Sequence, residues 1–303
     1  MSRQRLSMSA LTFATAQVLR VLPRARISRA AGQLADHVWS APLGRAVVGL
    51  YSRLYDVDFG ECEQRDGWRN FDSFFTRALR PGTRPVARDP RVIVSPADGR
   101  IESMGRIDET STFTVKGRPY RVEELVGDAD EARRFAGGFG CVVYLSPRDY
   151  HRVHSPIEGT IRRVRSFPGD YFPVNSIGLE HVPNLFARNR RVAIEIDSPP
   201  ESGLGRCTVV MVVAMIVGRI TVTGVDAWDV PLGDHEFNPP LRVERGGELG
   251  MFHLGSTAAV FLEKCAAGRW LSAEGPIRYG EPLAQPPDES SVAATPHVNG
   301  GGE

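Results

Sequence analysis

Apolar residues change their spacing about a quarter of the way along the chain. In LTFATAQVLRVLPRARISRAAGQLADHVWSAPLGRAVVGLYSRLY, residues 11–55, they recur three and four positions apart, with two proline interruptions. This period places apolar side chains on one face of a helix. WRNFDSFFTRAL repeats it, with Phe71, Phe74 and Phe75 on a shared face, and RPGTRPVARDP then ends the pattern. We therefore predict that residues 1–80 form a helical region.

Beyond this region the apolar residues come in short runs rich in valine and isoleucine, separated by glycine and proline. The runs are RVIVSPADGRI, GCVVYLSP, HSPIEGTIRRV, RRVAIEID, CTVVMVVAMIVGRITV and AAVFLEKC. Short β-branched runs between turn residues are typical of antiparallel strands. We therefore predict an α+β protein, with the helical N-terminal region followed by a mainly antiparallel β domain over residues 90–280.

Two of the runs share the pattern S-P-x-x-G-x-I. They are SPADGRI at residues 95–101 and SPIEGTI at residues 155–161. Such turns recur in barrel-sandwich domains of the lipoyl or biotinyl type, so we expect barrel-sandwich-like repeats and two related halves. The alternative is a chance similarity between two Pro-Gly turns.

The chain ends in EPLAQPPDESSVAATPHVNGGGE, where proline, serine, glycine and acidic residues replace the apolar runs. This composition predicts a disordered tail over residues 281–303 without catalytic content. The longest apolar run, residues 209–217, is far shorter than the roughly 20 residues that span a bilayer as a helix. We interpret it as a buried strand, and the N-terminus shows no signal peptide.

Charge changes this picture at the N-terminus. The whole chain has a formal net charge of +1, which gives no electrostatic reason to expect nucleic acid as a partner. Residues 3–53, however, carry many arginines, and Asp36 is the one acidic residue up to Leu54. A basic amphipathic segment can lie on an anionic membrane surface. The alternative is a helical cap packed on the main domain, and the two interpretations do not exclude each other.

Candidate chemistry begins with RDYHRVHSP, which places His151 and His154 three residues apart. On a helix this spacing occurs in metal sites, but Pro147 and Pro156 bracket the stretch and no third ligand stands at a diagnostic spacing. The other interpretation uses a histidine as a base, so both remain open from the residues alone.

A base matters because the chain also offers a nucleophile and a carboxylate. A serine hydroxyl attacks well when a base takes its proton, and a carboxylate orients that base. Ser256 in FHLGSTAAVF and Asp98 in SPADGRI supply these groups. The simpler interpretations are a turn at Ser256 and an Asx turn before Gly99.

The order of the motifs is more specific than any one of them. SPADG, RDYHRVHSP, FPVN, LFARNRRVAIEI, VGRI and FHLGSTAAVF follow one another along residues 50–280. Together they resemble the phosphatidylserine decarboxylase family, pyruvoyl-dependent enzymes of phospholipid synthesis, in its larger prokaryotic form. LGST is the most diagnostic block. It departs mildly from common family forms at His253, where other residues often stand.

The resemblance implies that the chain is a proenzyme that cuts itself between Gly255 and Ser256. Ser256 attacks the carbonyl of Gly255, and elimination and hydrolysis then leave a pyruvoyl group made from Ser256. The products are a β chain of residues 1–255 and an α chain of residues 256–303. Intramolecular attack gains a high effective concentration, and a glycine allows the turn that the approach requires.

The resemblance also implies roles for the other candidates. In the family's triad, His154 takes the serine proton and Asp98 orients the imidazolium, with Ser256 as nucleophile. His151 handles a proton in the decarboxylation step. The covalent pyruvoyl group from Ser256 is the expected cofactor, and no metal is expected.

The implied reaction converts phosphatidylserine to phosphatidylethanolamine through a Schiff base with the pyruvoyl ketone. The expected partners are phosphatidylserine in an anionic membrane and the protein's own α and β chains, with a homo-oligomer allowed. The expected location is the cytoplasmic face of the cell membrane, as a peripheral protein.

Three alternatives stay open. A pyruvoyl decarboxylase of another amine would use the same internal serine but would not need the basic N-terminus for a soluble substrate. A barrel-sandwich carrier would need a lysine on an exposed hairpin, and Lys116 lacks the Met-Lys flank. A serine hydrolase would keep Ser256 as a free hydroxyl in an uncut chain, and no GxSxG motif occurs.

Overall fold

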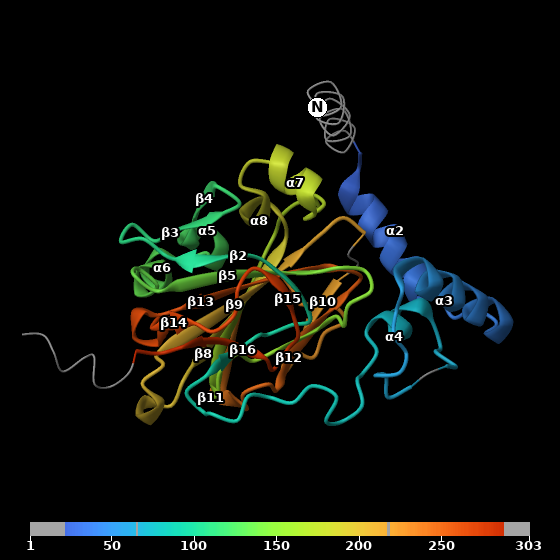
Figure 1. Ribbon diagram of the computed structural model, residues 1–303. Coiled ribbons are helices and arrows are strands. Elements are labelled where there is room, and N and C mark those ends of the chain that lie inside the picture. Colours follow the sequence, from blue (N-terminus) through green and yellow to red (C-terminus); the bar gives the residue numbers. More distant parts are fainter. Residues whose placement is uncertain (1–21, 65, 217–218, 288–303) are drawn as a thin grey trace, which may run out of the picture.

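The structure, a computed structural model, describes residues 22–64, 66–216 and 219–287 (Figure 1). Its helices are α2 (Arg24–Asp36), α3 (Ala41–Tyr55), α4 (Phe71–Phe75), α5 (Val122–Val126), α6 (Ala129–Arg134), α7 (Ser176–His181) and α8 (Leu185–Arg188), with short 3₁₀ turns at Pro200–Ser202 and Lys264–Ala266.

The strands follow the helical N-terminal part of the chain. They are β1 (Ile93–Val94), β2 (Gly99–Arg106), β3 (Thr112–Val115), β4 (Arg118–Arg121), β5 (Phe139–Leu145), β6 (Arg152–His154), β7 (Gly159–Phe167), β8 (Arg191–Asp197), β9 (Arg206–Val213), β10 (Arg219–Val222), β11 (Gly233–Val243), β12 (Glu248–His253), β13 (Ser256–Leu262), β14 (Arg269–Trp270), β15 (Gly275–Ile277) and β16 (Pro282–Gln285).

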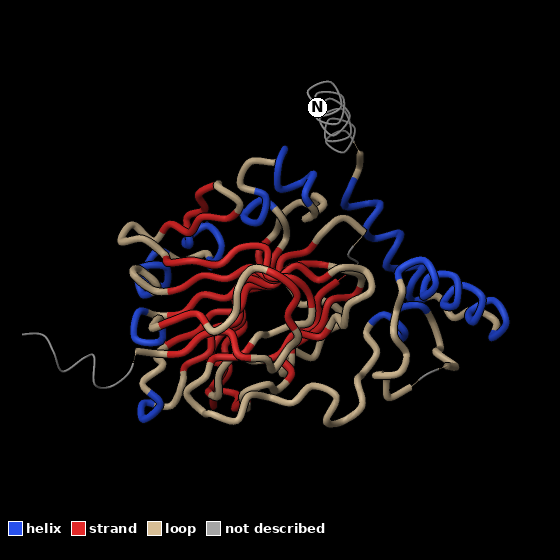
Figure 2. The backbone as a smooth tube through the Cα atoms, in the orientation of Figure 1, coloured by secondary structure: helices blue, strands red, loops and turns tan. Residues whose placement is uncertain are grey.

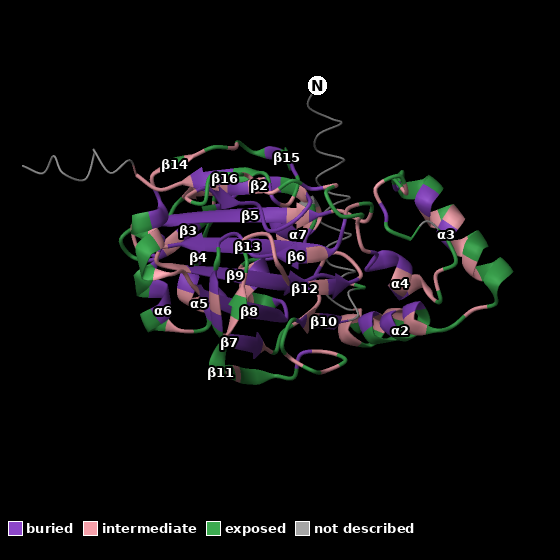
Figure 3. Cartoon of the chain, turned by 90° about the horizontal axis from the view of Figure 1, so that it is seen from below, coloured by how far each residue is buried: buried purple, intermediate pink, exposed green. Residues whose placement is uncertain are grey.

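Eight strands form one antiparallel sheet in the order β11-β7-β8-β9-β13-β5-β2-β15. Strand β13 lies near its centre, and all seven of its residues are buried. Figure 3 shows β5, β9 and β13 as a buried layer, whereas the helices are partly exposed. The predicted α+β class with a mainly antiparallel sheet is confirmed.

The two similar turns adopt the same local structure. Ser95 Oγ donates to the Ala97 carbonyl, and Ser155 Oγ donates to the Ile157 carbonyl, each two residues further along. The two segments also bond to each other, since Val94 N–H donates to the Pro156 carbonyl and His154 N–H donates to the Pro96 carbonyl. Their likeness in sequence therefore has a structural basis.

Two three-stranded sheets accompany the large one, and β3 and β4 pair in a separate two-stranded sheet. Strands β10, β12 and β6 form the first, and β1, β16 and β14 form the second. The second sheet corrects the tail prediction. Leu283 and Ala284 on β16 are fully buried, and Ala284 pairs with Ile93 and Trp270. Residues 281–287 therefore belong to the folded domain, and residues 288–303 lie outside the described residues.

Helices α2, α3 and α4 lie together at one side of the strands (Figures 1 and 2). An aromatic cluster joins α3 to α4, in which Tyr51 of α3 contacts the rings of Phe71, Phe74 and Phe75. The second predicted helix is shorter than its apolar pattern suggested, because Asn70 caps it and the chain leaves the helix after Phe75. Residues 1–21 of the predicted helical region lie outside the described residues.

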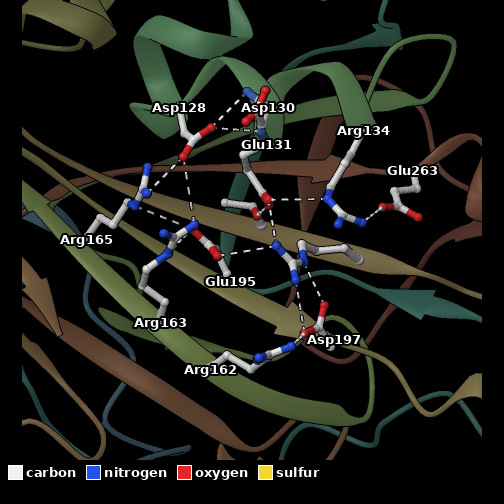
Figure 4. A network of polar contacts seen from close by, with 12 residues as sticks. Asp128, Asp130, Glu131, Arg134, Arg162, Arg163, Arg165, Glu195, Asp197 and Glu263 are labelled. Carbon is white, nitrogen blue, oxygen red and sulfur yellow. Dashed lines mark hydrogen bonds and ion pairs between the residues drawn. The ribbon is translucent and has the colours of Figure 1, made fainter. Parts of the chain in front are cut away.

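A network of charged side chains covers one region of the large sheet (Figure 4). Glu131 and Glu195 are each only 3% exposed. The Arg206 guanidinium lies 2.7 Å from a Glu131 oxygen and 3.4 Å from a Glu195 oxygen, and it also bonds Asp197. Buried carboxylates need such partners, because an unpaired buried charge is strongly unfavourable.

Replacing Arg206 with methionine should therefore lower the free energy of unfolding by about 3–5 kcal/mol, the usual effect of removing one partner of a buried ion pair. Urea unfolding of the purified protein measures this change. Arg162→Met is the matched control, because its side chain is 64% exposed and lies 3.8 Å from Asp197 at the network's edge. A loss for Arg206→Met no larger than that of the control would contradict the prediction.

Candidate active site

Ser256 begins the central strand β13. Its backbone pairs with Leu145 of β5 on one side and Val213 of β9 on the other, so its position is fixed by two neighbouring strands. The residue is 1% exposed, and its Oγ has no hydrogen-bond partner among the described residues. A buried hydroxyl without a partner is unfavourable for stability and is a common feature of functional sites.

The residues just before Ser256 have left-handed backbone conformations. Leu254 has φ 81° and Gly255 has φ 26°. A non-glycine residue in this region is strained by about 1–3 kcal/mol, and such strain clusters at functional sites. The peptide between Gly255 and Ser256 is thus held between a strained turn and a rigid strand.

His151 is the histidine that faces this peptide. Its Nε2 lies 3.9 Å from the position that a Cβ on Gly255 would take. The ring is fully buried and packs on Phe75, with 4.0 Å between ring centroids. Nδ1 donates to the Asp149 carbonyl at 2.8 Å, which leaves the lone pair on Nε2, and Nε2 has no partner among the described residues.

The His151 ring is neutral near pH 7. Burial lowers its pKa to about 3, and the Arg77 guanidinium acts in the same direction. Arg77 also fixes the turn that carries the histidine, because its Nη2 donates to the carbonyls of Arg148 and Asp149. The result is a positioned imidazole that can accept a proton at Nε2.

His154 is placed differently. Nδ1 donates to the Gly246 carbonyl at 2.8 Å, so the lone pair lies on Nε2, which accepts the Tyr150 hydroxyl at 3.2 Å. The ring stacks on Tyr279, with 3.8 Å between centroids. Burial lowers its pKa as well. Both ring nitrogens of His154 are therefore occupied.

Asp98 lines a polar cleft of about 430 Å³ that also includes Arg77 and Tyr150. Its carboxylate pairs with Arg84 at 2.6 Å and accepts the Tyr279 amide at 2.9 Å. Asp98 and His154 thus both contact Tyr279, Asp98 through its backbone amide and His154 through its ring, and no hydrogen bond joins these two described residues directly.

The structure brings two predicted residues together at Gly255, namely His151 and Ser256. It places Asp98 and His154 around Tyr279, without a hydrogen bond from either to the serine hydroxyl. The triad of the three residues stays a prediction. The sequence did not identify Arg77, because the segment FDSFFTRAL was interpreted only as a helix face. No motif indicated that Tyr279 contacts both Asp98 and His154.

An apolar pocket of about 390 Å³ opens at the same peptide. Leu254 and Gly255 form part of its lining, and Tyr51, Phe71 and Phe75 of the helices form another part. Helices α2–α4 therefore provide much of the wall beside the candidate scissile bond. Such a pocket suits an apolar ligand.

Among the described residues, no group of three or more histidine, cysteine, aspartate or glutamate side chains is placed to hold a metal ion.

Comparisons with known proteins agree with the motifs. The family model described as phosphatidylserine decarboxylase matches residues 71–285. A phosphatidylserine decarboxylase proenzyme of Anaeromyxobacter sp. (strain K) is 38% identical over 273 residues, which cover 88% of this chain and 95% of the relative. Its counterpart from Pseudomonas aeruginosa (strain LESB58) is 40% identical over 280 residues, or 88% and 94%. The chain belongs to the phosphatidylserine decarboxylase family.

Proposed function

We propose that this chain is a self-processing proenzyme that decarboxylates phosphatidylserine to phosphatidylethanolamine. The observation that carries the proposal is a pair of buried atoms beside Gly255, the hydroxyl of Ser256 and Nε2 of His151, neither of which has a hydrogen-bond partner within the described part of the chain. A free nucleophile and a free proton acceptor at one strained peptide fit an internal attack on that peptide.

In the proposed processing, Nε2 of His151 accepts the hydroxyl proton while Oγ of Ser256 bonds to the Gly255 carbonyl carbon. The C–N bond breaks and the peptide becomes an ester, with the proton returned to the serine nitrogen. Loss of the Cα proton of residue 256 to water and cleavage of its Cβ–O bond then release the Gly255 carboxylate and leave a dehydroalanine. Addition of one water molecule and loss of one ammonia leave a pyruvoyl group at the start of the second chain.

The residues present fit such a group. Ser256 lies at the end of a rigid strand, beside a pocket whose lining includes Leu254 and Gly255. When formed, the pyruvoyl group supplies a ketone for the substrate's amine and an electron sink for the lost carboxylate. The chain's own residues exclude water, and His151 can hold or return a proton near the reacting carbon.

The apolar wall favours a lipid over a soluble amine as the substrate. Of the residues that line the pocket beside Gly255, most are apolar or aromatic, and helices α2, α3 and α4 contribute many of them. None of the helices in the described part of the chain is long and apolar enough to cross a membrane. From the apolar pocket wall we infer that the protein binds the membrane surface as a peripheral protein, and the expected face is the cytoplasmic one.

Helix α3 offers the contact surface. Leu43, Leu50 and Leu54 lie seven and four positions apart, which places them on one face, and they are 53%, 68% and 72% exposed. Exposed leucines beside a basic helix are typical of proteins that insert shallowly into the interface.

The double variant Leu50→Glu/Leu54→Glu should bind vesicles of phosphatidylserine and phosphatidylcholine at least about tenfold more weakly, since each buried leucine contributes about 1.5–3 kcal/mol. Vesicle co-sedimentation measures this, and the melting temperature should not change because both side chains are exposed. Leu271→Glu is the matched control, as an exposed leucine outside the helices. Equal binding by both variants would reject α3 as the contact surface.

The activity itself is tested with purified protein and vesicles that contain phosphatidylserine. Carbon dioxide and phosphatidylethanolamine should appear in equal amounts, and free serine in solution should react far more slowly. Preferred turnover of a soluble amine would favour the rival decarboxylase instead. Release of fatty acid by an uncut chain would favour a serine hydrolase.

A further inference from the structure

A second histidine, His253, lies close to the candidate scissile bond along the chain. It precedes Gly255, whereas Ser256 follows it. His253 ends strand β12, two positions before Gly255, and is 6% exposed. Its Nδ1 lies 2.8 Å from a carboxylate oxygen of Asp72 and donates to it. Its Nε2 lies 3.1 Å from the Thr221 hydroxyl. Both ring nitrogens are therefore bonded, and the ring orientation is fixed.

Asp72 is itself held in place. It lies in the first turn of α4, is 7% exposed, and its Oδ2 accepts Nη2 of Arg219 at 2.8 Å. Nη1 of Arg219 reaches Asp36 at the end of α2, at 2.6 Å, and its guanidinium carbon lies 4.6 Å from the centre of the Trp228 ring. A carboxylate fixed on both sides is a rigid acceptor for the histidine.

The partners come from elements far apart in the sequence. Asp72 and His253 are 181 positions apart, and Arg219 of β10 pairs directly with His253 of β12 in the sheet register. The chain of contacts from Asp36 through Arg219 and Asp72 therefore joins helices α2 and α4 to the strand that leads into the Gly255 turn.

This arrangement restrains the turn from both ends. Ser256 is fixed in β13 by two neighbouring strands, and His253 is fixed at the end of β12 by Asp72. Leu254 and Gly255 alone connect these points, and both have positive φ angles. The conformation of the candidate scissile peptide thus depends on where His253 is held.

We propose that Asp72 and His253 form a positioning pair for self-cleavage, which holds the Leu254–Gly255 turn in the conformation that presents the Gly255 carbonyl to Ser256. The inference rests on the proposed function. Neither side chain exchanges a proton with the reacting atoms; each acts through the backbone. The pair also connects the helices that wall the apolar pocket to the turn.

The test follows self-cleavage in the full-length chain made by cell-free synthesis with a radiolabel. Samples taken over time show the conversion of the intact chain to two fragments. Asp72→Ala and His253→Ala should each slow this conversion by about tenfold or more, because small displacements of reacting groups have large effects on rate. The double variant should be no slower than the slower single variant, since the two residues act as one unit.

Rescue separates positioning from general stability. Asp72→Asn keeps an oxygen that can accept the His253 Nδ1–H, so it should cleave within about threefold of the unmodified chain while Asp72→Ala stays slow. His235→Ala is the control, because His235 lies on the edge strand β11 of the large sheet and its Nε2 donates to the Pro231 carbonyl. It should cleave at the normal rate.

The outcomes distinguish this inference from the proposed function. If the unmodified chain never cleaves, the proposed function fails. If it cleaves and Asp72→Ala and His253→Ala match its rate, the positioning pair is rejected. Additive slowing in the double variant would also overturn it, because that result shows that the two side chains act independently of each other.

Discussion

Replacing Ser256 with alanine should leave one uncut polypeptide without decarboxylase activity. The substitution removes Oγ, the proposed nucleophile that attacks the Gly255 carbonyl, and with it the source of the pyruvoyl ketone. The folded chain should remain intact, because Ser256 Oγ has no hydrogen-bond partner to lose among the described residues. Denaturing electrophoresis and the vesicle assay measure cleavage and activity, and the melting temperature reports the fold.

The next residue on the same strand supplies a matched control. Thr257 is also 1% exposed, and its Oγ1 likewise has no partner among the described residues. Thr257→Val keeps its shape and removes its hydroxyl, so this variant should cleave and react normally. Cleavage or activity in Ser256→Ala would contradict the account, and so would loss of both in Thr257→Val with an unchanged melting temperature.

Replacing His151 with alanine should slow self-cleavage by about a hundredfold or more, the usual contribution of a positioned general base. The reason is geometric: Nε2 of His151 faces Gly255 and bonds to none of the residues that the structure describes, whereas Nε2 of His154 accepts the Tyr150 hydroxyl. His154→Ala should therefore slow cleavage much less. The rate of fragment formation in cell-free synthesis measures both variants.

The same experiment tests the triad that the motifs suggest. In that triad His154, oriented by Asp98, takes the serine proton. Normal cleavage in His151→Ala together with an uncut His154→Ala chain would contradict our assignment and favour the triad. Added imidazole offers a further check, because it can enter the space left by the His151 ring and should partly restore cleavage in His151→Ala alone.

The strands and the nucleophile could be predicted because their signals are local. Short β-branched runs between turn residues predict antiparallel strands without knowledge of their partners. Ser256 stands out because a glycine and a serine interrupt an apolar run. The strand Pro282–Gln285 has no such signal, since its proline-rich composition resembles a tail. Only its pairing with the neighbouring β14 and with β1, far away in the sequence, makes it part of the fold.

The roles within the site depend on contacts that spacing does not encode. His151 and His154 share one motif, and only their hydrogen bonds separate the free lone pair from the occupied one. His253 looks like a mild variation until the fold places Asp72 beside it. Local patterns identify residue types that can react, whereas the tertiary structure determines which atoms are free to do so.

The mass of the intact chains of the purified, active protein tests the central claim most directly. We predict two chains, a large one that ends at Gly255 and a small one that begins at position 256. The small chain should be lighter by one ammonia than the same peptide with an amino-terminal serine, and it should resist sequencing from that end. An active protein that contains one uncut chain, or a small chain that begins with unmodified serine, would contradict the account.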